Sequence, residues 1–105
     1  MASDAGYFEY IKEQLSGIEN ISYRKMMGEY IIYAGDRIVG GIYDNRLLIK
    51  PVDAAVKYVK APKYELPYDG AKEMLFIENV DDREFLTGLI NTALDEFPVV
   101  KKRKK

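Results

Sequence analysis

Residues 29–51 read EYIIYAGDRIVGGIYDNRLLIKP, and this stretch decides the fold. It is rich in tyrosine and isoleucine, and these residue types favour β-strands. Gly35-Asp36 and Asp44-Asn45 interrupt the apolar runs with residues that are typical of tight turns. The pattern predicts an antiparallel meander of three strands, which ends at Pro51 and has its strands at 29–35, 37–43 and 46–50.

Alternation along these strands predicts which side chains share a face of the sheet. Ile38 and Gly40 would lie on one face of their strand with Ile42, whereas Val39 and Leu48 would face the other way. Glycine weakens a strand interior, so the pair Gly40-Gly41 calls for an explanation. It indicates a β-bulge or room for a neighbouring ring or backbone, and close approach of a ligand is the functional alternative.

The segments around the meander complete an α+β domain. Apolar residues at helical spacing predict two long helices and a short one, at 4–16, 82–96 and 52–59. Two more strands are expected at 21–27, with Tyr23 and the Met26-Met27 pair pointing inward, and at 73–79. Residues 60–72 are expected to form a loop. The expected architecture is an antiparallel sheet, the meander with the 21–27 strand before it plus one further strand, flanked by these two long helices and one short helix.

Length and residue types exclude many functions. The 105 residues are enough for one domain, expected at 1–98, followed by a basic disordered tail at 99–105. The sequence has no cysteine and no histidine, which excludes disulfides, thiol or imidazole catalysis and Cys/His zinc sites. A Ser–Lys pair, for instance Ser22 with Lys25 or Lys50, is formally open, but nothing in the spacing selects it. We therefore expect no catalytic residues, no metal and no cofactor.

The densest acidic cluster is Asp81-Asp82-Arg83-Glu84. Carboxylates at this density could bind a hard cation. They also stand at the start of a predicted helix, where acidic residues cap free N–H groups and interact favourably with the helix dipole. Capping explains the cluster without a ligand.

Charge divides the chain into an acidic body and a basic end. The formal net charge is −1, yet residues 1–100 hold 11 Lys and Arg against 17 Asp and Glu, a net charge of −6. The candidate nucleic-acid contact is therefore the tail, Lys101, Lys102, Arg103, Lys104 and Lys105. A short run of like charges is also typical of a disordered, solubilising end.

The N-terminal sequence and the absence of long apolar runs bear on location. The chain begins MASDAGYFEY, which has no apolar core of a signal peptide. No apolar run approaches the roughly 20 residues that cross a bilayer. We therefore expect a cytoplasmic protein without membrane contact.

Tyrosine is abundant, with nine residues in the chain. Tyr30, Tyr33 and Tyr43 lie in the meander and Lys50 ends it, so these four residues form the candidate interaction surface. Strands also favour tyrosine simply because they half-bury it.

The stretch from Met26 to Pro51 resembles the N-terminal domain of the TfoX (Sxy) family of competence regulators. That domain has a Met-x-Gly stretch, an aromatic-rich strand, a glycine-containing turn and a strand that ends in lysine before a helix. The matching positions are Met26-Met27-Gly28, Tyr30-Ile31-Ile32-Tyr33, Gly35 and Leu48-Ile49-Lys50. The resemblance extends over roughly residues 4–97 and implies an α+β fold without catalytic residues. It also implies a link to the regulation of DNA-uptake competence through protein contacts at promoters.

Three hypotheses about function follow. The first is an interaction or regulatory domain that binds another protein, similar to the TfoX N-terminal module. The second is a nucleic-acid accessory protein that acts through the tail. The third is a small-molecule binder or enzyme, which needs a concave apolar pocket with converging polar groups between the sheet and the 52–59 helix. A homodimer formed at the sheet edge also stays open.

Overall fold

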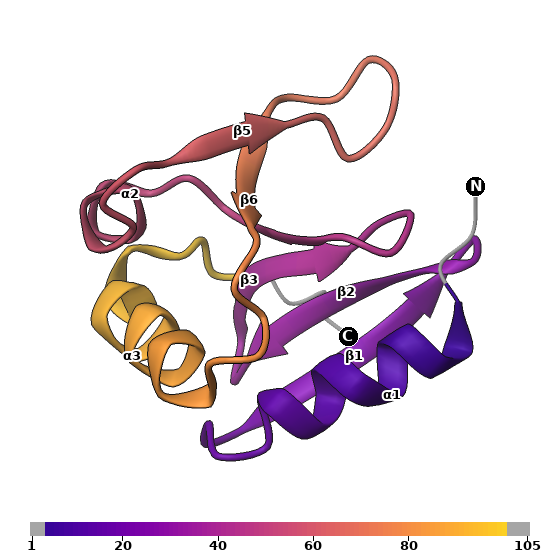
Figure 1. The fold of residues 1–105 in the computed structure, drawn as a ribbon, viewed down its shortest axis with the longest axis horizontal. Helices are drawn as coiled ribbons and strands as arrows, with labels where there is room; N and C mark the ends of the chain where they lie inside the picture. The colour runs from indigo at the N-terminus through magenta and orange to yellow at the C-terminus, as the bar shows by residue number, and fades with distance from the viewer. Residues whose placement is uncertain (1–3, 101–105) are drawn as a thin grey trace, which may run out of the picture.

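The predicted meander is present as part of a larger sheet. The computed structural model describes residues 4–100 and contains a six-stranded sheet in the order β1-β2-β3-β4-β6-β5 (Figure 1). Every neighbouring pair of strands is antiparallel, so the α+β class is confirmed. The strands are β1 Ile21–Met26, β2 Glu29–Ala34, β3 Arg37–Ile42, β4 Leu47–Ile49, β5 Lys63–Glu65 and β6 Met74–Ile77.

The helices lie close to the predicted positions: α1 Ala5–Gln14, α2 Asp53–Tyr58, α3 Arg83–Ala93 and the 3-10 helix η1 Leu94–Glu96. The Asp4 carboxylate caps α1 by accepting a hydrogen bond from the Gly6 amide at 3.3 Å. At the start of α3, the Asp82 carboxylate accepts one from the Phe85 amide at 3.0 Å. The capping interpretation of the acidic cluster is thus confirmed for Asp82.

The helices α1 and α3 lie along the same side of the sheet (Figure 1). Ile11 of α1, Leu15 at the C-cap of α1, and Leu86 and Leu89 of α3 are fully buried. They form one hydrophobic core with the strand residues that face them, which include Tyr30, Ile32, Ile42, Leu47, Ile49, Leu75 and Ile77. Burial of these apolar surfaces is the main stabilising contribution in a chain of this size.

The strand β3 departs from regular alternation at Val39. Ile32 pairs with Gly40 and Tyr33 pairs with Ile38, which leaves Val39 as the extra residue of a β-bulge. As a result Val39 is fully buried in the core, and Ile38 lies on the opposite face with Tyr33. The alternation predicts the reverse for Ile38 and Val39, and that prediction is wrong because the bulge shifts the alternation by one residue.

Two further expectations are wrong. Residues 60–72 contain a strand, β5, which forms the edge of the sheet beside β6. Met26 and Met27 do not point inward: their exposed fractions are 44% and 95%, because Met27 and Gly28 form the turn between β1 and β2. Tyr23 does face the core and is partly buried against it.

The C-terminal end of the described chain pairs with the start of β3. The Ile38 amide donates to the Pro98 carbonyl at 2.9 Å, and the Val100 amide donates to the Asp36 carbonyl at 2.7 Å. Contacts with the sheet therefore continue to Val100, two residues past Pro98. The five basic residues 101–105 lie outside the described residues. Between residues 4 and 100, no helix is both long and apolar enough to span a bilayer.

Gly40 is required by the close approach of β4. A Cβ atom at Gly40 would lie 2.1 Å from the Leu48 carbonyl oxygen and 2.8 Å from the Ile49 Cα. These are backbone atoms of a paired strand, so they cannot move aside without disturbing the sheet. Gly40→Ala should lower the free energy of unfolding by about 2 kcal/mol or more, as measured by urea denaturation.

The matched control is Gly17→Ala, because a Cβ there meets nothing within 4 Å. This variant should stay within about 0.5 kcal/mol of the parent protein. Equal losses in the two variants would contradict the close packing of β3 against β4.

Tyr23 has a buried hydroxyl whose pKa is raised by burial. Its ring meets Phe8 edge-on, with centroids 5.4 Å apart, and its hydroxyl has no hydrogen-bond partner among residues 4–100. Burial raises the pKa of Tyr23 to about 12, against about 10 in an unfolded chain. Folding therefore favours the neutral phenol, so its contribution to stability is complete below pH 10 and is lost as the pH rises toward 12.

The Tyr23→Phe variant removes this titration and the unpaired hydroxyl. Relative to Tyr23→Phe, the parent protein should lose stability between pH 10 and 12, and the two should run parallel at neutral pH. Denaturation curves over this range provide the measurement. A constant difference between the variants up to pH 12 would show that the Tyr23 hydroxyl is hydrated in the folded protein.

Candidate interaction surface on the open face of the sheet

The face of the sheet turned away from α1 and α3 is named the open face here. It carries Ile31 and Tyr33 of β2, and Ile38, which pairs with Tyr33. The loop at 66–73 lies over part of this face and leaves a groove of about 580 Å³ beside it. Residues that line the groove include Ile31, Ile38, Tyr43, Tyr68, Met74 and Lys50. The groove is therefore largely apolar, and the charged residues Lys50, Lys72 and Glu73 also line it.

Tyr43 is the central aromatic residue of the groove. Its ring packs over Gly41, where a Cβ atom would come within 2.6 Å of the ring, so this glycine leaves room for an aromatic side chain. The centroids of the Tyr43 and Tyr68 rings are 6.2 Å apart at an angle of 58°. Burial raises the pKa of Tyr43, and the nearby Tyr68, Glu29 and Tyr33 raise it further. Tyr43 thus keeps its hydroxyl proton at neutral pH.

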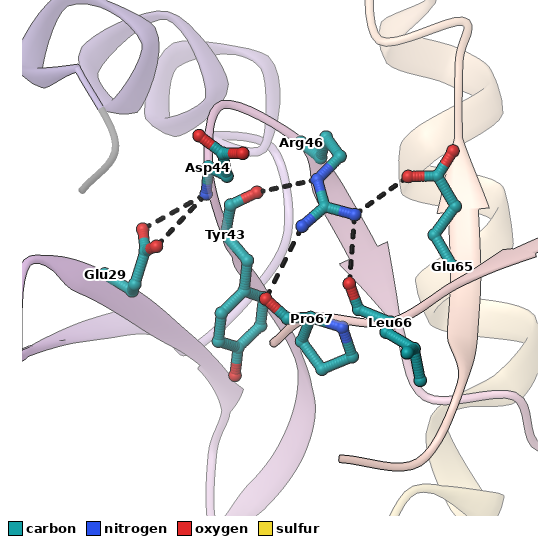
Figure 2. A network of polar contacts seen from close by, with 7 residues as sticks. All are labelled: Glu29, Tyr43, Asp44, Arg46, Glu65, Leu66 and Pro67. Carbon is teal, nitrogen blue, oxygen red and sulfur yellow. Dashed lines mark hydrogen bonds and ion pairs between the residues drawn. The ribbon is translucent and has the colours of Figure 1, made fainter. Parts of the chain in front are cut away.

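Arg46 fixes the loop to the meander (Figure 2). Its Nη1 donates to the Glu65 carboxylate at 2.8 Å and to the Leu66 carbonyl at 3.0 Å, and its Nε donates to the Tyr43 carbonyl at 3.1 Å. The Arg46 side chain is 23% exposed, so these charge-assisted bonds are partly shielded from water. Arg46 therefore holds the turn that carries Tyr43 beside the loop that carries Tyr68.

The structure separates the predicted surface residues. Tyr33, Tyr43 and Lys50 are partly exposed, and Tyr43 and Lys50 line the groove. Tyr30 is different: it is 9% exposed, belongs to the core and stacks on Phe8, with centroids 3.8 Å apart and planes 2° apart. The expectation that Tyr30 belongs to an exposed patch with Tyr33 is wrong, because neighbouring strand positions of opposite parity face opposite sides.

Sequence reasoning missed Tyr68. It is 63% exposed, and it lies in the loop that follows β5. The abundance of tyrosine was the available signal, but local sequence does not say that residues 25 positions apart, Tyr43 and Tyr68, meet. Only the fold of the loop onto the meander brings them together.

Other candidate sites can now be placed. Ser22 and Lys25 are three residues apart on β1 and so lie on opposite faces of it, while Lys50 lies beyond β4, three strands away. Neither lysine can serve Ser22 as a base. In residues 4–100, no group of three or more acidic side chains is arranged to hold a metal ion.

A second, largely apolar pocket of about 700 Å³ lies between α2, β6 and α3, with Tyr58, Phe76 and Phe85 in its lining. This pocket lies beside α2, where the small-molecule hypothesis needs one, and that hypothesis stays open.

Arg46 and Lys63 provide a matched pair of ion-pair variants. Arg46→Met should lower the free energy of unfolding by about 1–3 kcal/mol, because it leaves several partly buried acceptors unpaired. It should also speed hydrogen exchange of the amides at 66–73. Lys63→Met removes the ion pair between Lys63 and Glu78, whose side chains are 60% and 56% exposed, respectively. This variant should lower the free energy of unfolding by less than about 0.5 kcal/mol. Unchanged exchange in the loop of Arg46→Met would contradict the role of Arg46.

Comparisons with known proteins assign the chain to a family. Residues 13–96 match the family model of the TfoX N-terminal domain. A protein of Spirochaeta aurantia, described as an uncharacterized 12.7 kDa protein in the trpE 5' region, is 31% identical over 105 residues, which cover 99% of this chain and 91% of that protein. No solved structure matches. Because the family match covers most of its length, the chain belongs to the TfoX N-terminal domain family.

Proposed function

We propose that this chain is a non-catalytic regulatory module of the cytoplasm that acts by binding another protein through the open face. Its membership of the TfoX N-terminal domain family supports a module of this type. The observation that carries the proposal is the pairing of Tyr43 with the 63% exposed Tyr68 over an apolar groove. By the resemblance to competence regulators, the process it controls is DNA uptake or a related transcriptional response.

The groove has the properties of a contact site between proteins. Tyrosine offers a large apolar ring together with a hydroxyl, and it loses little entropy on binding because it has few rotatable bonds. Arg46 anchors the loop before binding, which reduces the cost of ordering it. Two lysines, Lys50 and Lys72, and one carboxylate, Glu73, line the groove, and neither lysine forms an ion pair within residues 4–100. They would favour a partner segment with a carboxylate beside its apolar side chain.

Affinity capture from nuclease-treated extract of the source cells tests this function, with two tyrosine variants as baits. Tyr68 lies over the open face, whereas Tyr64 is 42% exposed and pairs with the core residue Leu75, which places it on the other face. Tyr68→Ala should reduce recovery of the captured partner about tenfold or more, as for a tyrosine at the centre of an interface. Tyr64→Ala should leave it unchanged.

A third bait, which ends at Val100, separates the tail from the groove. This bait should recover the partner as well as the full chain does. Loss of recovery on truncation, with Tyr68→Ala still active, would assign binding to the basic tail instead. Recovery of no protein above the resin control would contradict the proposed function.

A further inference from the structure

Met27 adopts a backbone conformation that does not suit its side chain. Between residues 4 and 100, four residues other than glycine have positive φ: Asn20, Met27, Asp44 and Asn45. Asparagine and aspartate tolerate this left-handed region, whereas a bulky side chain there is an outlier. In the two-residue turn between β1 and β2, φ is 53° at Met27 and 85° at Gly28. Turns with positive φ at both positions favour Asn-Gly.

Folding provides no compensation for methionine at this position. The Met27 side chain is 95% exposed, so it gains almost nothing from burial. The equivalent turn between β3 and β4 shows the favoured solution, because Asp44 and Asn45 both have positive φ there. Residues held in sparsely populated backbone conformations are concentrated at functional sites. The methionine at this turn therefore calls for a role outside the folding of the chain.

The turn that carries Met27 lies beside the turn and loop that border the groove. The Glu29 carboxylate accepts hydrogen bonds from the Asp44 amide at 3.2 Å, and Arg46 joins the same turn to Leu66 (Figure 2). Figure 1 shows the β1–β2 turn, the β3–β4 turn and the β5–β6 loop at one end of the sheet. The β1–β2 turn, with the last residue of β1, and the β5–β6 loop carry exposed large apolar side chains at this end, and we name these four residues the turn-end surface: Met26, Met27, Leu66 and Tyr68.

The chemistry of this end selects the kind of partner. Methionine is unbranched and polarizable, so it fits apolar pockets of irregular shape. Charges of both signs flank the turn in the sequence, with Arg24 and Lys25 before it and Glu29 after it. Asp44 of the next turn lies beside Glu29. The basic run that would attract an anionic membrane is at 101–105, whereas residues 1–100, which include this surface, have a net charge of −6, so a lipid surface is disfavoured at this end. A protein pocket with an apolar floor and a rim of mixed charge fits these features.

We propose that Met27 is an anchor residue that inserts into an apolar pocket of a different protein, bound across the turn-end surface and the adjoining groove. This inference rests on the proposed function and identifies the part of the surface that is energetically central. It also explains why a turn that Asn-Gly would stabilise carries methionine instead.

Reciprocal substitutions test the conformational cost. Met27→Asn should raise the midpoint of thermal unfolding, because asparagine tolerates positive φ. Asn20→Met should lower it, since Asn20 is exposed and has a φ of 59° at the other end of β1. A midpoint that is unchanged or lower in Met27→Asn would overturn the proposal, because methionine would then have no cost to explain.

Site-specific crosslinking in the source cells identifies the occupant. A photoreactive diazirine amino acid replaces Met27 in one protein, Asn20 in a second and Tyr68 in a third. The expected result is an adduct with another protein at positions 27 and 68 and none at position 20. An adduct of position 27 with a second copy of this chain or with lipid, or no adduct there, would overturn the anchor. If position 68 still forms an adduct, the proposed function stands without the anchor, and if neither position does, both fall.

Discussion

Burial of a single face of the sheet beneath α1 and α3 is the constraint on which the rest of the structure depends. Ile11 of α1 and Leu89 of α3 are completely buried in one core with the strand residues below them. Both long helices lie on that face. The open face, with its aromatic residues, is therefore covered only in part, by the loop at 66–73. Tyr30 and Tyr33, three residues apart in one strand, consequently differ: one stacks on Phe8 inside the core and the other lies beside an open groove.

Much of this architecture is local in origin and could be predicted from the sequence. Helical spacing located α1 and α3, turn residues at Gly35-Asp36 and Asp44-Asn45 located the hairpins, and the acidic residues before α3 indicated its cap. The short strand β5 was missed because three residues between two prolines carry too little periodicity to be recognised. Its pairing with β6, rather than its own sequence, makes it a strand.

The parts that could not be predicted depend on contacts between distant residues. The bulge at Val39 shifts the alternation of β3, and it is visible only in the pairing with β2. The groove exists because Arg46 bonds to the backbone and side chain of residues about 20 positions later, a contact without a local pattern. Exposure of Met27 follows from its place in a turn, whereas its hydrophobicity indicates burial. Each of these features contributes to the surface that the proposed function uses.

The central claim is that one face of the sheet packs against the helices and the other binds a partner. Hydroxyl-radical footprinting tests this claim most directly when it is done on the purified protein and again after the protein is added back to cell extract. In the free protein, Tyr68 should be modified readily and Tyr30 protected. In extract, protection should appear at Tyr43, Tyr68 and Met27, while Tyr10 on α1, which is 39% exposed, stays as reactive as before. Equal modification of Tyr30 and Tyr68 in the free protein, or protection confined to Tyr10, would contradict the account.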